Sequence, residues 1–449
     1  MRYLSHTDHD RRAMLAEIGV NSIDDLFADV PTEARLDGLV DLPKHAGELA
    51  VERALSKLAA KNTVAGTVPF FLGAGAYRHH VPASVDHLIQ RSEFLTSYTP
   101  YQPEVAQGTL QYLFEFQTQV AMITGMDVAN ASMWDGSTST AEAVTMACRA
   151  TRRKKAVLSG NLHSHYRAAT TTTTGTLDIT LDVAPPAPKD DEDLSTRIGK
   201  DTACVVVQYP DMYGHIRDYT ALAEKCRENG ALLIVVVTEI VALGALRSPG
   251  SMGADIVVGE GQSIGNGLNF GGPYLGLFAT RQKYLRQMPG RVCGETTDDD
   301  GRRGFVLTLS TREQHIRREK ATSNICTNAG LCCLAFTIHM SLLGEHGFSD
   351  LAKLNHARTA QLAHRIETEV TGASMVNDNF FNEFTIDLGR NAAAVVDSLA
   401  AQNVLVGVPV SRLEPDREDL ANLLLVAVTE TVTDDHMSIL ISSLQEALS

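Results

Sequence analysis

The sequence predicts an α/β fold built on a large, mostly parallel sheet, followed by a smaller C-terminal α/β unit. Three apolar runs, at 202–210 (TACVVVQYP), 231–237 (ALLIVVV) and 254–259 (ADIVVG), are typical of strands that are covered on both faces. A helical stretch at 220–230 (TALAEKCRENG) separates the first two runs. Because parallel neighbours need a long crossover connection, strands that alternate with helices favour a parallel sheet.

The first 65 residues are expected to form an arm of short helices. Thr7 can cap a helix that runs to Ile18, and Gly19 suits the left-handed conformation that ends it. The cap works because the threonine oxygen accepts an N–H of the first turn that has no partner within the helix. Two further helices are expected, at 23–30 and at 48–60.

The large domain is expected to span residues 66–330. Apolar residues at helical spacing predict buried helices at 110–125 and 140–153. A strand is expected at 156–160. The threonine-rich stretch at 169–183 is predicted to be β structure as well, since β-branched side chains favour strands.

The small C-terminal domain is expected to span residues 331–449. A long apolar helix at 329–344 leads into it. Apolar segments near 380–388 and 422–428 predict two strands, and 434–448 predicts the last helix.

Composition excludes several functional classes. The net charge of −15 argues against a nucleic-acid surface. The longest apolar run, 231–237, is far shorter than the roughly 20 residues of a membrane span, so no membrane association is expected. The N-terminal segment lacks the apolar core of a signal peptide, which favours a cytoplasmic location. The seven cysteines are scattered and form no CxxC pair, so no metal site is assigned.

The segment 134–144 (WDGSTSTAEAV) places a glycine and four hydroxyl residues directly before a helix. Free N–H groups and the positive end of the helix dipole make such a turn suitable for a phosphate. Serine and threonine are also ordinary helix caps, so the segment by itself leaves both readings open.

The loop at 254–276 (ADIVVGEGQSIGNGLNFGGPYLG) resembles the loop that carries the Schiff-base lysine in pyridoxal-phosphate enzymes. No lysine occurs in it. The strand before it ends at Thr238, where such enzymes place an aspartate that pairs with the pyridine nitrogen of the cofactor. The adjacent Glu239 is expected to point to the opposite face of the strand. With both groups missing, this copy of the site is predicted not to be catalytic.

The chain resembles the N-terminal half, or alpha subunit, of the glycine cleavage system P-protein family. The resemblance lies in three long stretches, 71–143, 253–280 and 288–328, and it covers essentially the whole chain. The runs SYTPYQPE (97–104) and REKATSNICTN (318–328) are its most specific parts. The family implies a type I pyridoxal-phosphate-dependent transferase fold with an N-terminal arm, a large domain and a small C-terminal domain.

The resemblance also explains the missing lysine. In the split form of this enzyme the family places the lysine on a separate beta subunit of similar fold, and its position corresponds to about Ser263 here. A serine hydroxyl cannot form an imine, so no catalytic residue is assigned to this chain. Pyridoxal phosphate is expected in the assembled complex, carried by the beta subunit and not bound covalently to this chain.

The activity that the resemblance implies is an oxidoreductase reaction shared between subunits. Glycine loses its carboxylate as carbon dioxide on pyridoxal phosphate, and the aminomethyl group passes to the lipoyl disulfide of the H-protein. The expected partners are therefore the beta subunit, most plausibly in an alpha2beta2 assembly, the lipoylated H-protein, and glycine as substrate. The chain is not expected to be active alone.

Two segments are candidates for cofactor or substrate contacts at the interface with the beta subunit. The first offers Tyr98 and Tyr101, whose rings carry hydrogen-bonding tips on a loop stiffened by two prolines. The second concentrates neutral donors beside Arg318 and Lys320, which suits an anion such as phosphate. Its candidate residues are Thr322, Ser323, Asn324 and Thr327. Both segments could instead be structural, as a surface loop and as the start of a helix.

Two other functions remain open from the sequence. One is a purely structural partner that stabilises the beta subunit without touching a ligand. The other is an independent pyridoxal-phosphate enzyme, against which the missing lysine argues. His163, which follows the strand at 156–160, could mimic the aromatic residue that stacks on the cofactor ring, but a structural role is favoured.

Overall fold

The computed structural model describes two compact units, residues 1–62 and 63–449. In the first unit, α1 (Asp8–Ile18) is capped as the sequence predicts. The Thr7 hydroxyl accepts the N–H of Asp10, and Gly19 closes the helix with φ of 84°. The described residues are 5–36, 38, 40–189, 192–323, 325 and 328–449.

The described residues of the rest of the first unit form short helical segments and are largely solvent-exposed. The helix expected at 23–30 is only a short 3-10 turn at Asp24–Phe27. The next helix, α2 (Glu48–Ala59), forms where expected but buries no side chain. Its residues Val51, Leu55 and Leu58 recur at i, i+4 and i+7, and all three are exposed. This apolar stripe is left without a partner inside its own unit.

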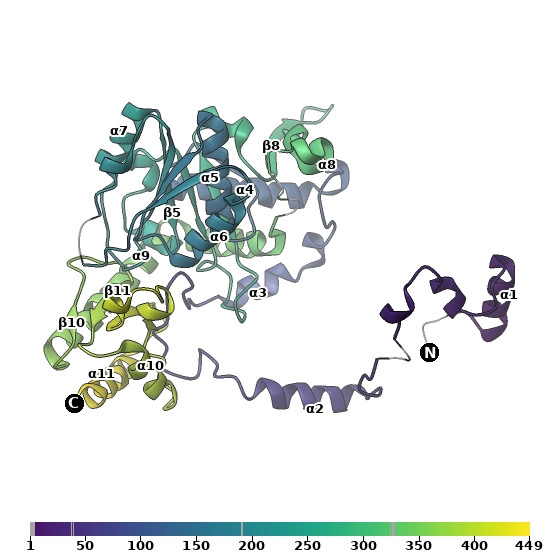
Figure 1. The fold of residues 1–449 in the computed structure, drawn as a ribbon. Coiled ribbons are helices and arrows are strands. Elements are labelled where there is room, and N and C mark those ends of the chain that lie inside the picture. The colour runs from purple at the N-terminus through teal and green to yellow at the C-terminus, as the bar shows by residue number, and fades with distance from the viewer. Residues whose placement is uncertain (1–4, 37, 39, 190–191, 324, 326–327) are drawn as a thin grey trace. The chain divides into compact units, whose positions relative to one another are not determined.

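The second unit contains a seven-stranded sheet, shown in Figure 1, with the order β1-β7-β6-β5-β4-β2-β3. The pairs β3–β2, β2–β4, β4–β5 and β5–β6 are parallel, while β7 runs antiparallel to β6 and β1. The mostly parallel sheet predicted from the apolar runs is confirmed. Its strands are β1 (Val128–Ala129), β2 (Lys155–Leu158), β3 (Thr180–Val183), β4 (Thr202–Gln208), β5 (Leu232–Val237), β6 (Ile256–Glu260) and β7 (Gly276–Thr280).

Both faces of the sheet are buried, and alternate residues of each strand pack into different cores. In β4, Val205 and Val207 join one apolar cluster, whereas Val206 joins the other. The alternation follows from the two-residue repeat of a strand. Helices cover both sides, which explains why these strands are apolar throughout. The covering helices are α4 (Gln107–Thr124), α7 (Thr220–Asn229) and the start of α9 (Gly330–Glu369) on the first side, and α5 (Gly136–Thr151) on the second.

The threonine-rich stretch at 169–183 is mostly helical, so the prediction of β structure there is wrong for its first part. Helix α6 (Ser164–Thr174) takes up the run of threonines, and only β3 is a strand. The hydroxyl of Thr174 donates to the carbonyl of Thr170 at 2.8 Å, and both side chains are buried. Packing of α6 against α5 thus overrides the strand preference of threonine.

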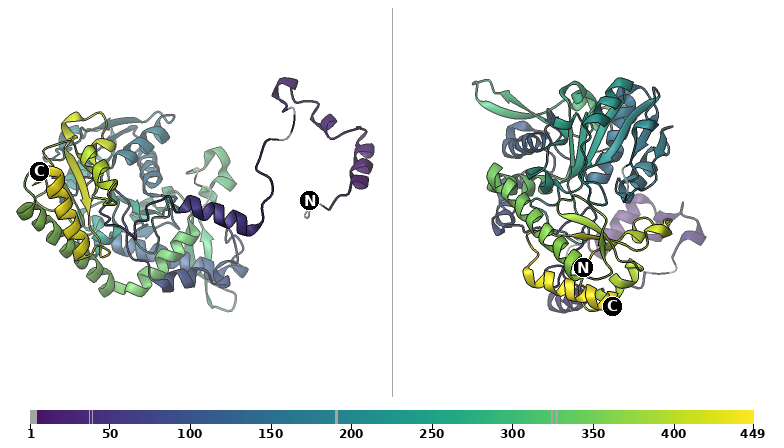
Figure 2. Two further views of the ribbon diagram at one scale, coloured as in Figure 1. Left: turned by 90° about the horizontal axis from the view of Figure 1, so that it is seen from below. Right: turned by 90° about the vertical axis from the view of Figure 1, so that its left-hand side faces the viewer.

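The C-terminal residues form a second, four-stranded antiparallel sheet with the order β10-β11-β13-β12. Both views in Figure 2 show the C-terminal helix of the chain beside the second half of α9. The strands near 380–388 and 422–428 and the final helix appear as expected. The elements are β10 (Ser374–Met375), β11 (Glu383–Asp387), α10 (Ala392–Ala400), β12 (Val408–Pro409), β13 (Leu423–Ala427) and α11 (Asp434–Leu448).

Helix α9 connects the two cores. Its first half packs into the large core through Cys333 and Phe336, and its second half packs into the small core through Leu362 and Ile366. A break at Gly344, where φ is 61°, separates the halves. By length and composition α9 is the one helix among the described residues that could cross a membrane, but half of its apolar window is buried inside the fold.

Two further groups of elements complete the unit. The sequence did not indicate the hairpin of β8 (Val292–Thr297) and β9 (Arg303–Thr308), which packs against α4. The short helix α8 (Gln314–Arg317) follows the hairpin in the chain, and the short helix α3 (Ala83–Ile89) packs against α9.

Candidate functional site

A cavity of about 610 Å³ lies at the carboxyl ends of the sheet strands, where the first turn of α5 meets the loops after β2 and β6. In open α/β sheets, this edge is where ligands bind. The wall contains the only tryptophan of the chain. The residues that line the cavity include Trp134, Asp135, His163, Tyr166 and Glu260.

The first turn of α5 is bonded by the chain's own carboxyl groups. Asp135 caps the helix, because its Oδ1 accepts the backbone N–H of Thr138 at 2.8 Å. The N–H of Gly136 donates to Oε2 of Glu260 at 3.0 Å. Gly136 is required here, since a Cβ would lie 2.3 Å from the hydroxyl oxygen of Tyr166. The capping side chain is thus Asp135, and the hydroxyls of Ser137 and Thr138 donate to oxygens of Asp135.

Glu260 ends β6 and is only 2% exposed. Its second oxygen, Oε1, accepts the backbone N–H groups of Gln262 at 3.1 Å and of Leu275 at 2.8 Å. Burial raises the pKa of this carboxyl to about 8, while the three N–H donors act in the opposite direction. The carboxyl group thus ties together α5, β6 and the strand that follows the loop.

Ser263 occupies the loop position where the resemblance places the lysine of the beta type. It is 1% exposed, and its Oγ has no hydrogen-bond partner among the described residues. One residue earlier in the chain, the side-chain oxygen of Gln262 accepts the N–H of Tyr77 at 3.1 Å. The loop is therefore held by packing and backbone contacts and offers no amine.

The end of β5 also lacks the group that a pyridine nitrogen needs. The Thr238 hydroxyl accepts Nε2 of Gln208 at 3.2 Å. Glu239 turns away into a separate network, in which its carboxylate accepts the N–H of Val241 at 3.0 Å and bonds to His79. Neither side chain lies in the wall of the 610 Å³ cavity.

His79 is a buried cation that the sequence did not indicate. Its Nε2 lies 2.9 Å from Glu239, and its Nδ1 lies 2.9 Å from Glu430. Burial alone would lower the pKa of His79, but the two carboxylates outweigh that effect and raise it to about 10. Burial likewise opposes ionisation of Glu430, yet His79 and the N–H of His80 lower its pKa to about 2. These partners are 160 and 351 residues away in sequence, so no local motif could have revealed them.

His163 borders the cavity, but its ring nitrogens bond to other groups of the protein. Its Nδ1 accepts the N–H of His165 at 3.1 Å, and its Nε2 lies 2.8 Å from the carbonyl oxygen of Ala74. Burial lowers its pKa to about 4, so the ring is neutral and donates from Nε2. Both ring nitrogens are used within the protein, in agreement with the structural role favoured by the sequence.

The loop after β6, the end of β5 and the first turn of α5 do not fit covalently bound pyridoxal phosphate. Ser263 supplies no amine, and Thr238 supplies no charge for the pyridine nitrogen. The N–H groups at the start of α5, which would otherwise suit a phosphate, already bond to Asp135 and Glu260. At these places the chain therefore lacks the group that would form the imine, the group that would pair with the pyridine nitrogen, and the free N–H donors that would hold the phosphate.

The structure connects the two segments that were predicted to contact a ligand. Arg291, which the sequence did not single out, is 4% exposed and lies directly before β8. It donates to the hydroxyl of Tyr101 at 3.3 Å and to the side-chain oxygen of Asn328 at 3.0 Å. Tyr98 is 90% exposed and Tyr101 is 51% exposed. Arg291 thus joins Tyr101 to Asn328 at the end of the second segment, whereas Tyr98 projects into solvent.

Of the four hydroxyl and amide candidates in the second segment, two lie among the described residues. Thr322 donates its N–H to the carbonyl of Arg312 at 3.0 Å, and the hydroxyl of Ser323 accepts the N–H of Ile325 at 3.1 Å. Both are half-buried. Asn324 and Thr327 lie outside the described residues.

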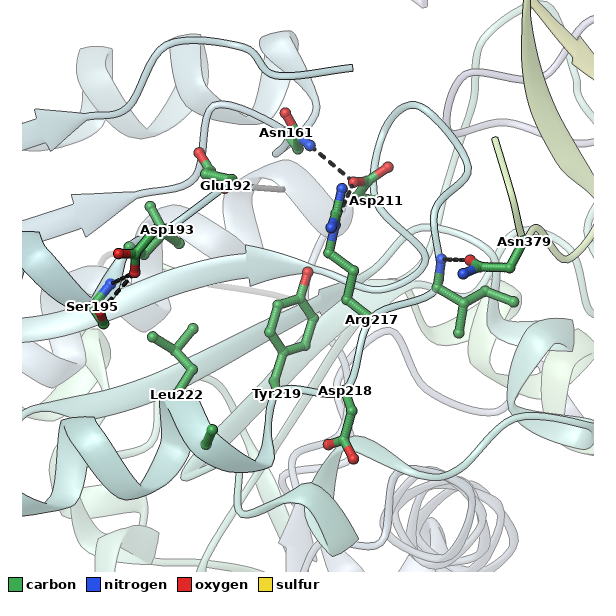
Figure 3. A pocket seen from close by; sticks show the side chains of 13 residues that line it. Asn161, Glu192, Asp193, Ser195, Asp211, Arg217, Asp218, Tyr219, Leu222 and Asn379 are labelled. Carbon is green, nitrogen blue, oxygen red and sulfur yellow. Dashed lines mark hydrogen bonds and ion pairs between the residues drawn. The ribbon is translucent and has the colours of Figure 1, made fainter. Parts of the chain in front are cut away.

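A second cavity, of about 540 Å³, is lined by several acidic groups and is shown in Figure 3. Asp211 accepts Nδ2 of Asn161 at 3.0 Å and lies 3.4 Å from Nε of Arg217. Asp193 and Asp218 accept bonds from residues of their own turns. The acidic groups of this cavity therefore serve to hold its wall together.

No group of three or more metal-ligating side chains is close enough to hold an ion in the part of the chain that the structure describes. Six of the seven cysteines are described, and all six are buried and free. Burial raises the pKa of these thiols, for example that of Cys148 to about 11, so they are thiols of the core.

The fold and the cavity at the strand ends define a class of protein. The chain is similar to mouse CSAD, with a TM-score of 0.68 and 15% identity over 95% of this chain and 92% of that one. It is also similar to the glutamate decarboxylase of Lactobacillus brevis, with a TM-score of 0.66 and 12% identity over 93% and 96% of the two chains. This is the type I pyridoxal-phosphate-dependent fold.

The particular family follows from closer matches. The model of the glycine cleavage system P-protein family matches residues 1–444. Proteins named probable glycine dehydrogenase (decarboxylating) subunit 1 are 65% identical in Rhodospirillum centenum and 64% identical in Parvibaculum lavamentivorans, over the full length of both chains. A crystal structure of an inhibitor-bound glycine decarboxylase (P-protein) has a TM-score of 0.89 and 40% identity over 100% of both chains. The chain belongs to the P-protein family and is a subunit of glycine dehydrogenase (decarboxylating).

Proposed function

We propose that this chain is the subunit of glycine dehydrogenase that lacks the Schiff-base lysine, and that it works with a lysine-bearing second subunit. The observation that carries the proposal is the loop after β6, where the buried Ser263 stands in place of the amine, together with the carboxyl group of Glu260 that bonds to the start of α5. Pyridoxal phosphate, held by the second subunit, would supply the electron sink for the decarboxylation of glycine. The aminomethyl group then passes to the lipoyl group of the H-protein, in the cytoplasm.

An alpha2beta2 assembly is the arrangement we propose. Support comes from the apolar stripe Val51, Leu55 and Leu58 on α2, which is exposed within its own unit. A row of exposed apolar side chains at helical spacing is typical of a surface that packs against a partner. An obligate interface of this kind commonly buries more than about 2,000 Å².

We propose that this chain contributes Tyr98, Tyr101 and the segment 322–327 to the partner's site. Arg291 supports this role, because it bonds both segments from a buried position and so fixes one beside the other. The tyrosines would supply apolar walls and hydroxyl groups that exclude water and orient the ligand. The hydroxyls of Thr322, Ser323 and Thr327, with Asn324, would donate to an anionic group beside Arg318 and Lys320.

The isolated chain is expected to form no covalent adduct with pyridoxal phosphate in the loop at 254–276. Ser263 cannot form an imine, so borohydride has nothing to reduce there. The measurement is peptide mass mapping of the chain after incubation with pyridoxal phosphate and borohydride. The lysine-bearing subunit, treated in the same way, is the positive control. A reduced adduct within 254–276 would show that this chain holds the cofactor itself.

Thr327→Val is expected to weaken the affinity of the assembled complex for pyridoxal phosphate by about tenfold to a hundredfold. A donor to a charged phosphate contributes about 1.5–3 kcal/mol when its geometry is good. The measurement is cofactor titration of wild-type and variant complexes at equal subunit occupancy, with assembly checked by sedimentation. Thr368→Val, at an exposed hydroxyl that bonds only to its own helix, is the matched control.

The outcome of that titration separates the two remaining functions. Equal affinities in the two complexes, with assembly intact, would mean that the segment is a helix start and that the chain is a structural partner. Weaker binding in Thr327→Val but not in Thr368→Val would place the segment at the cofactor.

A further inference from the structure

We propose that the carboxyl groups of Glu260 and Asp135 close this chain's own cavity to phosphate-bearing ligands by occupying the N–H donors at the start of α5. The inference goes beyond the proposed function, because it concerns the cavity of this chain and not the partner's site. It explains why the phosphate-binding turn at the start of α5 persists in the fold without serving a phosphate.

The first turn of α5 has few N–H groups left for a ligand. The N–H of Gly136 bonds to Glu260, the N–H of Thr138 bonds to the Asp135 side chain, and the N–H of Asp135 bonds to the hydroxyl of Thr138 at 3.4 Å. A phosphate at a helix N-terminus depends on these donors. With three of them taken, an incoming phosphate would have to displace a carboxyl group.

Glu260 is fixed too firmly to move aside. Its two oxygens accept three backbone N–H groups, from Gly136, Gln262 and Leu275. The side chain is buried and enters from the end of β6. Displacing it would leave three buried donors without partners, which is costly. Its occupancy of the turn does not depend on its charge.

The hydroxyl of Tyr166 also lies at the first turn of α5. A Cβ on Gly136 would lie 2.3 Å from this hydroxyl. The side chain is buried and belongs to the cavity wall. A hydroxyl donor at that place suits an anion, and the two neighbouring carboxyl groups keep one out.

The test is phosphate binding by the full-length chain and its Glu260→Ala variant, with inorganic phosphate as the probe. Trp134 lines the cavity and is the only tryptophan, so its fluorescence reports on binding there. We expect phosphate to bind Glu260→Ala at least tenfold more tightly than the wild-type chain. In thermal unfolding, phosphate should raise the Tm of the variant about 1–3 °C more than that of the wild type, compared with chloride at equal ionic strength.

Two further variants keep the test decisive. Asp135→Asn retains a good helix cap and removes one negative charge, so it should also gain phosphate affinity even if Glu260→Ala does not fold. Tyr166→Phe changes no charge at the turn and should gain none. Phosphate stabilises folded proteins in general, so the differences between variants are the measure. Phosphate binding by the wild type as tight as by the variants, or no gain in either carboxyl variant, would overturn the proposal.

Discussion

His79→Gln is expected to lower the free energy of unfolding of this chain by about 3–5 kcal/mol. The substitution removes a buried cation and leaves Glu239 and Glu430 facing each other across the space that it held. Glu239 also accepts a bond from Nδ2 of Asn382 in the small domain, at 3.1 Å. The network therefore joins the end of β5 to the C-terminal domain, and its loss should loosen that junction first.

The effect should depend on pH in a definite direction. The folded-state pKa of His79, about 10, lies above its ordinary value of 6.5, so its contribution is complete below pH 6.5 and lost as the pH rises toward 10. The folded-state pKa of Glu430, about 2, lies below its ordinary value of 4.5, so its contribution is complete above pH 4.5 and lost as the pH falls toward 2. The difference between wild type and variant should be greatest between about pH 4.5 and 6.5.

Denaturant unfolding at a series of pH values measures both quantities. His364→Gln, at an exposed position on α9, is the control and should change the free energy of unfolding by less than about 0.5 kcal/mol. A loss below about 1 kcal/mol for His79→Gln, or a loss that stays constant from pH 6.5 to 10, would mean that His79 is not a buried cation.

Arg291→Met is expected to destabilise the chain by about 3 kcal/mol and to weaken cofactor binding in the assembled complex. The substitution keeps an extended side chain but removes every donor. Nε of Arg291 lies 3.6 Å from the buried carboxylate of Glu313, which would be left without its partner. Tyr101 and Asn328 would lose the bonds that hold their segments together.

The control for this variant is Arg303→Met. Arg303 pairs with Glu295 at 2.8 Å on the surface of the β8–β9 hairpin, where a pair is worth less than about 1 kcal/mol. Unfolding of the isolated chain and cofactor titration of the complex separate the two roles of Arg291. If stability falls while cofactor affinity stays unchanged, the tyrosine loop and the 318–328 segment do not act together at the partner's site.

The sequence alone was sufficient for the class of fold and for the missing nucleophile. Strands β4, β5 and β6 are buried on both faces. A continuous run of apolar residues indicates this burial from the sequence of each strand alone. The cap of α1 is equally local, because Thr7 and Asp10 bond across three residues. The absence of lysine from 254–276 can be read directly from the sequence. Properties of these kinds depend on residues that are neighbours in the chain.

The tertiary structure alone decided which polar groups meet. Threonines 170–174 form a helix because α6 packs on α5, although threonine favours strands. His79 becomes a cation because the fold brings Glu239 and Glu430 to it from 160 and 351 residues away. Glu260 reaches Gly136 across 124 residues and turns a phosphate-like motif into a closed one. Such pairs carry no periodic signal, since their energy arises from burial that only the folded chain creates.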